Sequence, residues 1–253
     1  MAVRLFSYFG SKVRIAKRYP APVYPTIVEP FAGAAGYSCL HFHKQVRLWE
    51  VNPTIHGAIN YIIQSDPEAI RSLPLLGNAD SIDDLRIEQE AKWLIGLWSA
   101  TAAAHPGKCL YKWAREGGNK SGYWSAKCRR RLAVTAAKIK HWEVHLGSYT
   151  DIPVDEIGPA TWFVDPPYQD AGRHYPFGSS LIDYTKLGEW CRALPGQVIV
   201  CENEGADWLP FRPLCSFSGA AKAGKSRRIT TEAVWMQNGN EYPGLFRRAN
   251  DAR

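Results

Sequence analysis

Long apolar runs and an apolar leader are both missing from this 253-residue sequence. No apolar stretch approaches the roughly 18 to 20 residues that a membrane helix needs. The amino-terminal residues run into a polar stretch, which is not the pattern of a secretory signal. We therefore expect a cytoplasmic protein that has no membrane partner.

Paired cysteines are also missing, although the chain has six of them. They are dispersed, and no two form a C-x-x-C pair, which argues against a disulfide framework and against structural zinc. His41 and His43 come nearest to a metal pair, but the surrounding residues do not complete the pattern of a zinc site. We expect reduced thiols and no metal.

The composition excludes disorder. Hydrophobic residues make up 45% of the chain and charged residues 22%, which is typical of a packed globular protein. The length suits one large domain, or a core domain with a smaller insert. The formal net charge of +7 favours a polyanionic partner but also fits an ordinary basic enzyme.

Strands and helices alternate in both outer parts of the chain. The patterns predict strands at residues 26–29, 46–50, 161–164, 197–201 and 231–236. They predict helices at residues 37–44 and 181–194, and another in which Ile55, Ile59 and Ile62 recur at helical spacing. This alternation predicts an α/β fold, in which a Rossmann-like parallel sheet has helices on both faces and binds ligands at the carboxyl ends of its strands.

The middle of the chain, residues 66–145, departs from this alternation. We expect an acidic helical opening over residues 80–90 and then an apolar helix through Trp93 and Leu97. From Lys108 to Lys140, ten basic residues face one acid, a local balance of +9. Interleaved aromatic rings and a glycine loop favour nucleic acid over the alternative of a solvated basic face, because basic groups neutralise phosphates and rings stack on bases.

A rigid loop follows the expected strand at residues 161–164. In Asp165-Pro166-Pro167-Tyr168 the two prolines fix the backbone and remove two donors. Asp165 offers an acceptor carboxylate, Pro166 an acceptor carbonyl and Tyr168 a flat ring. Two acceptors and a ring match an exocyclic amino group on a planar heterocycle, which we favour over a structural turn.

A glycine loop follows the first expected strand. Glycines at residues 31–36 let the backbone approach a ligand, and Glu50, which ends the second strand, can accept hydrogen bonds from ribose hydroxyls. The full G-x-G-x-x-G pattern is absent. The loop therefore predicts an adenosine-type ligand without phosphates in preference to a dinucleotide or a nucleoside triphosphate.

Four short blocks give the sequence a family resemblance. They are Phe9-Gly10-Ser11-Lys12, residues 29–36, Trp49-Glu50-Val51-Asn52 and Asp165-Pro166-Pro167-Tyr168. Their order resembles that of Dam-type DNA adenine N6-methyltransferases of the alpha group, in which a target-recognition domain is inserted between the cofactor motif and the catalytic motif. Residues 66–145 themselves match nothing by eye.

The resemblance implies a site-specific methyltransferase that transfers a methyl group from S-adenosylmethionine to a flipped adenine in double-stranded DNA. It implies a catalytic domain at residues 1–65 and 146–253, and a small, mainly helical inserted target-recognition domain at residues 66–145. Catalysis is implied for Asp165, Pro166, Pro167 and Tyr168. Cofactor binding is implied for Tyr8, Gly10, Lys12, Pro30, Phe31, Gly33, Gly36, Glu50 and Asp165.

The DNA contacts follow from the basic stretch. We assign them to Lys112, Arg115, Lys120, Lys127, Arg129, Arg130 and Arg131. A second basic cluster lies at residues 222–228 and is either a DNA-contacting loop or a solvated one. We expect a monomer or a weak dimer.

The sequence departs from the family pattern in three places. Ser11 stands where the family often has a second glycine, and Ala35 displaces the second glycine of the Phe-x-Gly-x-Gly loop. The acid-aromatic pair before the catalytic loop has Gly147-Ser148-Tyr149 as its counterpart. Ser148, Tyr149 or Asp151 could then supply a supporting contact to the base.

Other functions remain open from the sequence. Cytosine N4, an RNA base or a protein amide also offers a planar amine to two acceptors. A catalytically inactive DNA-binding relative would explain the altered glycine loop and the missing acid. A nicotinamide-dependent enzyme fits less well, because the phosphate-binding glycines of G-x-G-x-x-G are absent.

Overall fold

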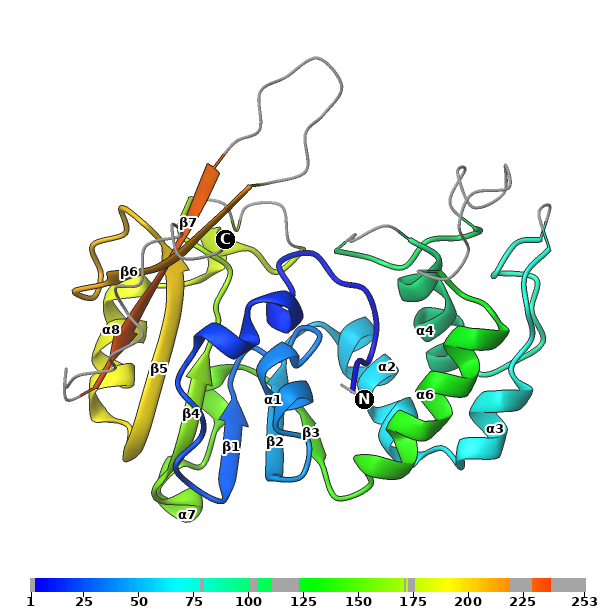
Figure 1. Ribbon diagram of the computed structural model, residues 1–253, viewed down its shortest axis with the longest axis horizontal. Helices are drawn as coiled ribbons and strands as arrows, with labels where there is room; N and C mark the ends of the chain where they lie inside the picture. The colour runs from blue at the N-terminus through cyan, green and yellow to red at the C-terminus, as the bar shows by residue number, and fades with distance from the viewer. Residues whose placement is uncertain are drawn as a thin grey trace, which may run out of the picture.

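A seven-stranded sheet runs through the part of the chain that the computed structural model describes, which is residues 3–77, 80–100, 104–110, 123–170, 172, 176–218 and 229–237. Its strand order is β3-β2-β1-β4-β5-β7-β6 (Figure 1). The strands are β1 (Thr26–Glu29), β2 (Gln45–Glu50), β3 (Glu143–Leu146), β4 (Ala160–Val164), β5 (Gly196–Asn203), β6 (Arg212–Ser218) and β7 (Ile229–Met236).

The central strands are parallel, and β7, which pairs antiparallel with β5 and β6, alone of these seven strands runs in the opposite direction. The predicted α/β class is confirmed, and the mixed, mostly parallel sheet is compatible with a Rossmann-like fold. Each of the five expected strands is present, with bounds within two residues of the expectation.

Side chains of the central strands alternate between two cores, as the period of two in a strand requires. In β4, Trp162 and Val164 belong to the core beneath α8 (Tyr184–Ala193), whereas Phe163 belongs to the larger core on the opposite face. Every residue of β4 is buried. Burial on both faces explains why these strands read as apolar runs instead of alternating patterns.

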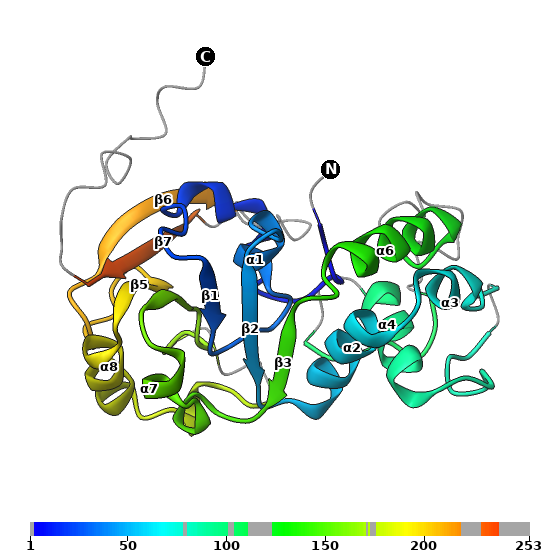
Figure 2. The ribbon, with the colours of Figure 1, turned by 90° about the horizontal axis from the view of Figure 1, so that it is seen from below.

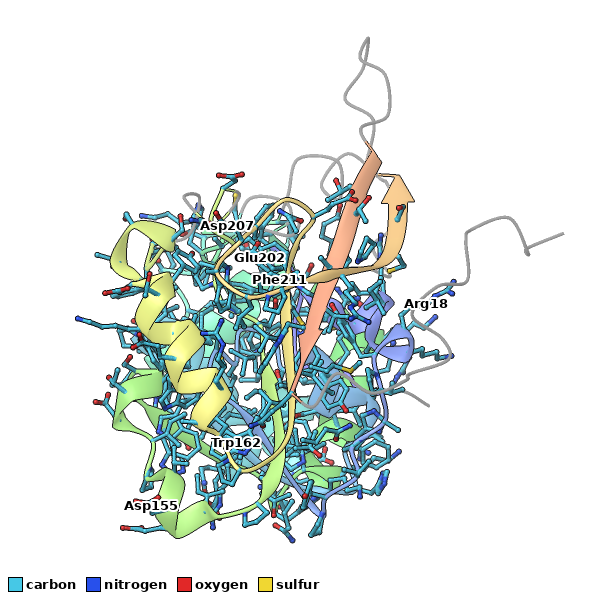
Figure 3. All side chains as sticks on the ribbon, turned by 90° about the vertical axis from the view of Figure 1, so that its left-hand side faces the viewer. Arg18, Asp155, Trp162, Glu202, Asp207 and Phe211 are labelled. Atoms are coloured by element: carbon cyan, nitrogen blue, oxygen red, sulfur yellow. The ribbon has the colours of Figure 1, made fainter. Side chains whose placement is uncertain are left out.

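Helices cover both faces of the sheet (Figure 2). Figure 3 shows α8 and α7 (Val154–Ile157), which carries Asp155, on one side, and the 3₁₀ turn η2 (Ala16–Arg18), which carries Arg18, on the other. The second face also carries α1 (Gly36–Leu40) and η1 (Lys12–Arg14). Two further 3₁₀ turns are η4 (Tyr149–Asp151) and η6 (Ser179–Leu181).

A group of helices lies beyond the β3 edge (Figure 1). It comprises α2 (Pro53–Gln64), α3 (Pro67–Ser72), α4 (Gln89–Ser99) and α6 (Ala126–Lys138). Their apolar side chains, such as Leu94 and Leu132, belong to the same core as Phe163 of the sheet. The middle of the chain is therefore packed directly against the sheet, and β3, the edge strand, begins within residues 66–145.

The acidic helical opening expected over residues 80–90 is wrong up to Glu88, because α4 begins only at Gln89. Side-chain oxygens bind nearby backbone N–H groups here. Asp80 Oδ2 accepts from Gly77 N at 2.6 Å, and Ser81 Oγ accepts from Asp83 N at 3.3 Å. Such local bonds offer the backbone an alternative to a helix.

The first and last expected helices are also shorter than predicted. Helix α1 ends at Leu40 instead of residue 44, and α8 begins at Tyr184 instead of residue 181. Asp183 fixes the start of α8, since its carboxylate accepts from Lys186 N at 3.1 Å and so caps the helix. No helix of the described residues is long and apolar enough to span a membrane.

Candidate active site

The candidate site lies at the carboxyl ends of β1, β2 and β4. Because these strands are parallel, the loops that follow them meet at one edge of the sheet. Strand order reverses between β1 and β4, since β2 and β3 lie on one side and β5 on the other. A ligand crevice is expected at such a switch point, and the two sequence loops of interest follow these two strands.

The Asp165-Pro166-Pro167-Tyr168 loop begins directly after β4 and is held from two sides. Tyr184 Oη of α8 donates to the Pro167 carbonyl, and Gly172 N donates to the Tyr168 carbonyl at 2.6 Å. A Cβ on Gly172 would come within 2.7 Å of the Pro167 carbonyl carbon, so only glycine fits against the loop. These contacts fix the loop independently of any ligand.

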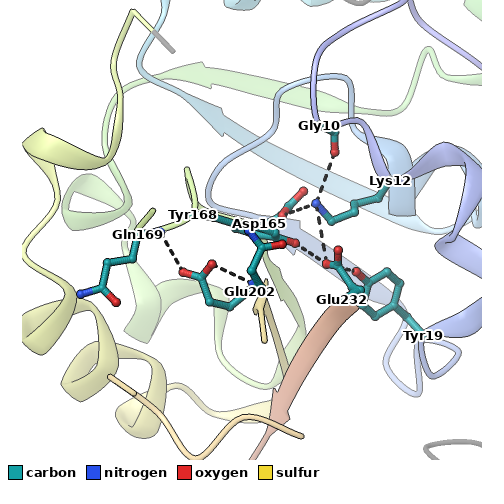
Figure 4. Close-up of polar contacts among 9 residues, drawn as sticks. Gly10, Lys12, Tyr19, Asp165, Tyr168, Gln169, Glu202 and Glu232 are labelled. Atoms are coloured by element: carbon teal, nitrogen blue, oxygen red, sulfur yellow. Dashed lines mark hydrogen bonds and ion pairs between the residues drawn. The ribbon is translucent and has the colours of Figure 1, made fainter. Parts of the chain in front are cut away.

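Lys12 joins this loop to the amino-terminal segment (Figure 4). Its Nζ lies 2.8 Å from Asp165 Oδ1, 3.9 Å from Glu232 Oε1 and 4.6 Å from the centre of the Tyr168 ring. It also donates to the Gly10 carbonyl at 3.3 Å. The Lys12 side chain is 8% exposed, so these contacts replace most of its hydration.

Burial and charge set the protonation of this cluster. Burial raises the pKa of Asp165 to about 6; the Lys12 ammonium opposes the rise and the Glu232 carboxylate adds to it. Burial alone would lower the pKa of Lys12, but the carboxylates of Asp165 and Glu232 raise it above its ordinary value. At pH 7 the cluster therefore holds a charged lysine beside a mostly ionised Asp165.

The glycine loop after β1 contacts the amino-terminal segment and β2. Gly33 has φ +48°, and a Cβ there would lie 3.4 Å from the Tyr8 ring. Glu50 accepts from Gly33 N at 2.9 Å and from Asn52 N at 2.9 Å, which ties the loop to the end of β2. Burial raises the pKa of Glu50, and these backbone bonds oppose the rise.

Gly36 brings the loop against η1. A Cβ on Gly36 would lie 2.8 Å from Val13 N and 3.0 Å from Lys12 N, so the absence of a side chain permits the contact. Ala35, the residue that departs from the family glycine, has φ +48° and ψ +49°. It adopts the left-handed conformation that glycine adopts without a Cβ penalty.

The structure therefore brings together most of the predicted cofactor and catalytic residues. Gly33 contacts both the Tyr8 ring and the Glu50 carboxylate. Lys12, in η1, contacts both Gly36 and Asp165. Pro30 follows β1 directly and is buried. The ring of Phe31 lies 5.6 Å from that of Tyr149, centre to centre, and both pack against the core that contains Trp162.

The Gly147-Ser148-Tyr149 counterpart follows β3, on the β2 side of the switch point. Gly147 N donates to the Glu50 carbonyl at 3.1 Å. Ser148 and Asp151 form a capping box around η4, in which Ser148 N donates to Asp151 Oδ2 at 2.7 Å. Both polar side chains therefore already bind local backbone groups.

The basic residues on α6 differ among themselves. Lys127, Arg130 and Arg131 are exposed in its first two turns. Arg129 is only partly exposed, and its guanidinium donates to the Leu73 carbonyl at the end of α3. Lys112, Arg115, Lys120 and the cluster at residues 222–228 lie outside the described residues.

Sequence reasoning missed two residues of the cluster, Tyr19 and Glu232. Glu232 Oε1 accepts from Tyr19 Oη at 2.7 Å and from Tyr168 Oη. Tyr19 follows η2, and Glu232 lies in β7, 213 residues later. The only sequence signal for Glu232 was an acidic residue within the expected strand at residues 231–236. An acid on the solvent-exposed face of a strand would give the same pattern.

Sequence reasoning also missed a phosphate-binding pattern at residues 219–226, which read Gly-Ala-Ala-Lys-Ala-Gly-Lys-Ser. This matches G-x-x-x-x-G-K-S/T, whose loop leads from a strand into a helix that binds phosphate at its amino end. Here strand β7 begins at Ile229, three residues beyond the pattern. The pattern lies outside the described residues, and the described element that follows it is a strand and not a helix, so the match does not support a nucleoside triphosphate site.

Comparison with models of protein families and with curated proteins finds no match to this chain. Within the described ranges, no group of three or more His, Cys, Asp or Glu side chains is placed to hold a metal ion.

Proposed function

We propose that this chain is an S-adenosylmethionine-dependent methyltransferase that acts on the exocyclic amino group of a flipped adenine in duplex DNA. One observation carries the proposal. The Asp165 to Tyr168 loop and the glycine loop lie on adjacent strands at the switch point, and Lys12 binds Asp165 at 2.8 Å. An amine-binding loop thereby lies beside a loop suited to an adenosine-type ligand.

The residues present fit the proposed cofactor. Gly33 and Gly36 present backbone without side chains, and Glu50 offers carboxylate oxygens at the end of β2 for ribose hydroxyls. Ser11 Oγ is buried and has no hydrogen-bond partner among the described residues, so it could bind a polar ligand group. S-Adenosylmethionine would supply an electrophilic methyl group on a sulfonium ion. Tyr8, Gly10, Lys12, Pro30, Phe31, Gly33, Gly36, Glu50 and Asp165 are the proposed binding residues.

The catalytic loop would act by positioning. The adenine amino nitrogen is a poor nucleophile because its lone pair is delocalised into the ring. The Asp165 carboxylate and the Pro166 carbonyl would each accept one N–H, which orients the amine and stabilises the positive charge that develops on it. The Tyr168 ring would stack on the base, on the face opposite Lys12.

An adenine within a duplex cannot reach this loop, so the base would flip out at a cost of roughly a few kcal/mol. Contacts to phosphates could offset that cost. The exposed residues Lys127, Arg130 and Arg131 lie on α6, within residues 66–145, which we propose as the inserted target-recognition domain. Lys112, Arg115 and Lys120 remain proposed contacts on sequence grounds.

Nucleoside analysis tests the proposed function. The protein is incubated with S-adenosylmethionine and mixed-sequence duplex DNA, and the digested nucleosides are analysed by mass spectrometry. N6-methyladenine is the expected product. N4-methylcytosine would reassign the base, and methylated RNA or protein in parallel reactions would reassign the substrate. DNA binding without S-adenosylmethionine binding in calorimetry would instead indicate an inactive relative.

A further inference from the structure

A second buried carboxylate lies next to the proposed catalytic loop. Glu232 belongs to β7, where it pairs with Asn203 of β5 and Cys215 of β6. Its side chain is 3% exposed. It shares a strand face with Val234, two residues away, which belongs to the larger core. A carboxylate this far from water is costly unless partners compensate for its lost hydration.

Its partners are also the partners of the catalytic loop (Figure 4). Glu232 Oε1 accepts from Tyr168 Oη, from Tyr19 Oη at 2.7 Å, and lies 3.9 Å from Lys12 Nζ. Tyr168 is the proposed stacking ring, and Lys12 binds Asp165. One buried carboxylate therefore contacts both the ring that would hold the base and the cation that pairs with the base acceptor.

The geometry points to Glu232 as a positioning residue for the proposed methyl transfer, which orients the Tyr168 ring through its hydroxyl and shares Lys12 with Asp165. The inference rests on the proposed function. A phenol that donates to a fixed carboxylate cannot swing its ring freely, so the stacking face is set before a base arrives.

The charge of Glu232 matters as well as its hydrogen bonds. Lys12 carries one positive charge and faces two carboxylates, so the cluster has one negative charge in excess when Asp165 is ionised. An excess negative charge in a buried site favours a sulfonium ligand and the positive charge that develops on the attacking nitrogen.

The groups that face Asp165 come from several elements. Burial raises the pKa of Asp165 to about 6, with Lys12 opposing the rise and Glu232 adding to it. Other titratable groups face the cluster from β1, β5, the catalytic loop and the segment after η2. They are Tyr19, Glu29, Tyr168, Cys201 and Glu202.

Glu232→Gln tests the inference, because glutamine keeps the size and an acceptor oxygen but removes the charge. We expect kcat for DNA methylation to fall about tenfold and the S-adenosylmethionine Kd to rise severalfold. We also expect the acidic limb of the pH–rate profile to move to lower pH, because the charge that raises the Asp165 pKa is gone. Glu204→Gln is the matched control and should behave as wild type, because Glu204 is an exposed acid just beyond β5 whose backbone N–H donates to Thr231.

Tyr168→Phe keeps the ring and removes the hydroxyl, so it provides a second route if Glu232→Gln folds poorly. If Glu232 acts through that hydroxyl, the double variant should lower the logarithm of kcat by less than the sum of the two single decreases. Glu232→Asp should restore part of the pH profile. Thermal unfolding of each variant separates a fold defect from a site defect.

Three outcomes would overturn the inference. A Glu232→Gln variant with wild-type kcat, Kd and acidic limb removes the positioning role. A loss of activity that tracks thermal stability, with the acidic limb unmoved, makes Glu232 purely structural. Tyr168→Phe at wild-type rate removes the route through the ring. If the wild-type protein itself methylates no DNA, the proposed function has failed instead, and the controls distinguish the two cases.

Discussion

Glu29 is a buried carboxyl group at the carboxyl end of β1, where its Oε1 accepts from Ser38 N at 2.7 Å. Burial raises the pKa of Glu29 to about 8, and its hydrogen bonds to Ser38 oppose the rise. Because the folded-state pKa lies above the unfolded value, the stability that this group contributes is fully present below pH 4.5. It is lost as the pH rises to about 8.

Glu29→Gln removes this titration and keeps the acceptor for Ser38. We expect the melting temperature of the variant to fall less than that of wild type between pH 5 and pH 8, as followed by thermal unfolding in buffers across that range. Glu68→Gln, at an exposed position on α3, should keep the wild-type pH dependence. Parallel curves for wild type and Glu29→Gln would contradict the assignment.

For single residues, the sequence identifies those that belong to a local pattern of neighbouring residues. The catalytic loop and the glycine loop could be located because their residues are adjacent in the chain. Glu232 could not, since its meaning depends on Tyr168, 64 residues away, and on Tyr19, 213 residues away. Arg129 shows the reverse problem: it reads as a DNA contact, but its guanidinium binds the Leu73 carbonyl.

At the scale of the elements, α1 packs closely against η1 at Gly36. Gly36→Ala would place a Cβ 2.8 Å from Val13 N, and backbone atoms there can yield only if η1 moves. Lys12 would move with η1 and away from Asp165. We expect a loss of about 1–3 kcal/mol in the free energy of unfolding and a drop of up to about 100-fold in methyl transfer.

Denaturant unfolding and a methylation assay measure these two effects. Gly107→Ala is a suitable control, because a Cβ there would meet its nearest atoms only at 3.5 Å. Wild-type activity in Gly36→Ala would show that the contact of η1 with Gly36 is not needed to hold Lys12 beside Asp165.

Helix α6 presents two kinds of arginine, and the salt dependence of DNA binding separates them. Replacing Arg130 and Arg131 with alanine should weaken binding and lower the slope of log K against log salt by about 2, which is roughly 0.9 per phosphate contact. Arg129→Ala should leave that slope unchanged and destabilise the fold, since it removes the bond to Leu73. An unchanged slope in the double variant would remove α6 from the interface.

The element pattern was predictable where strands are buried on both faces. The expected strands of β1, β2, β4, β5 and β7 are confirmed. The first four are parallel central strands, which leave apolar runs in the sequence, whereas β7 is antiparallel and is buried at Glu232, Ala233 and Val234. Edge strands β3 and β6 were missed: every residue of β3 is at least partly exposed, and β6 contains a proline and an irregular register near Pro213. Edge positions relax the apolar pattern that identifies a strand.

Across the whole molecule, the site is assembled from segments that are far apart in sequence. The amino-terminal segment, the loops after β1 and β4, and strand β7 all reach the switch point of one sheet. The net charge is also distributed unevenly along the chain. The stretch from Lys108 to Lys140 carries a local +9, whereas the formal total is +7, so the remaining residues sum to −2. The proposed division into a catalytic body and a DNA-binding insert accounts for this division of charge.

The most direct test of this account is the transfer of a labelled methyl group from S-adenosylmethionine to duplex DNA by wild type, Asp165→Ala and Asp170→Asn. Asp170 is exposed and lies just beyond the catalytic loop, which makes it the matched control. We predict transfer by wild type and Asp170→Asn, and a loss of at least about 100-fold in Asp165→Ala, with folding and S-adenosylmethionine binding largely preserved by the other proposed binding residues. Transfer by Asp165→Ala at the wild-type rate would contradict the account.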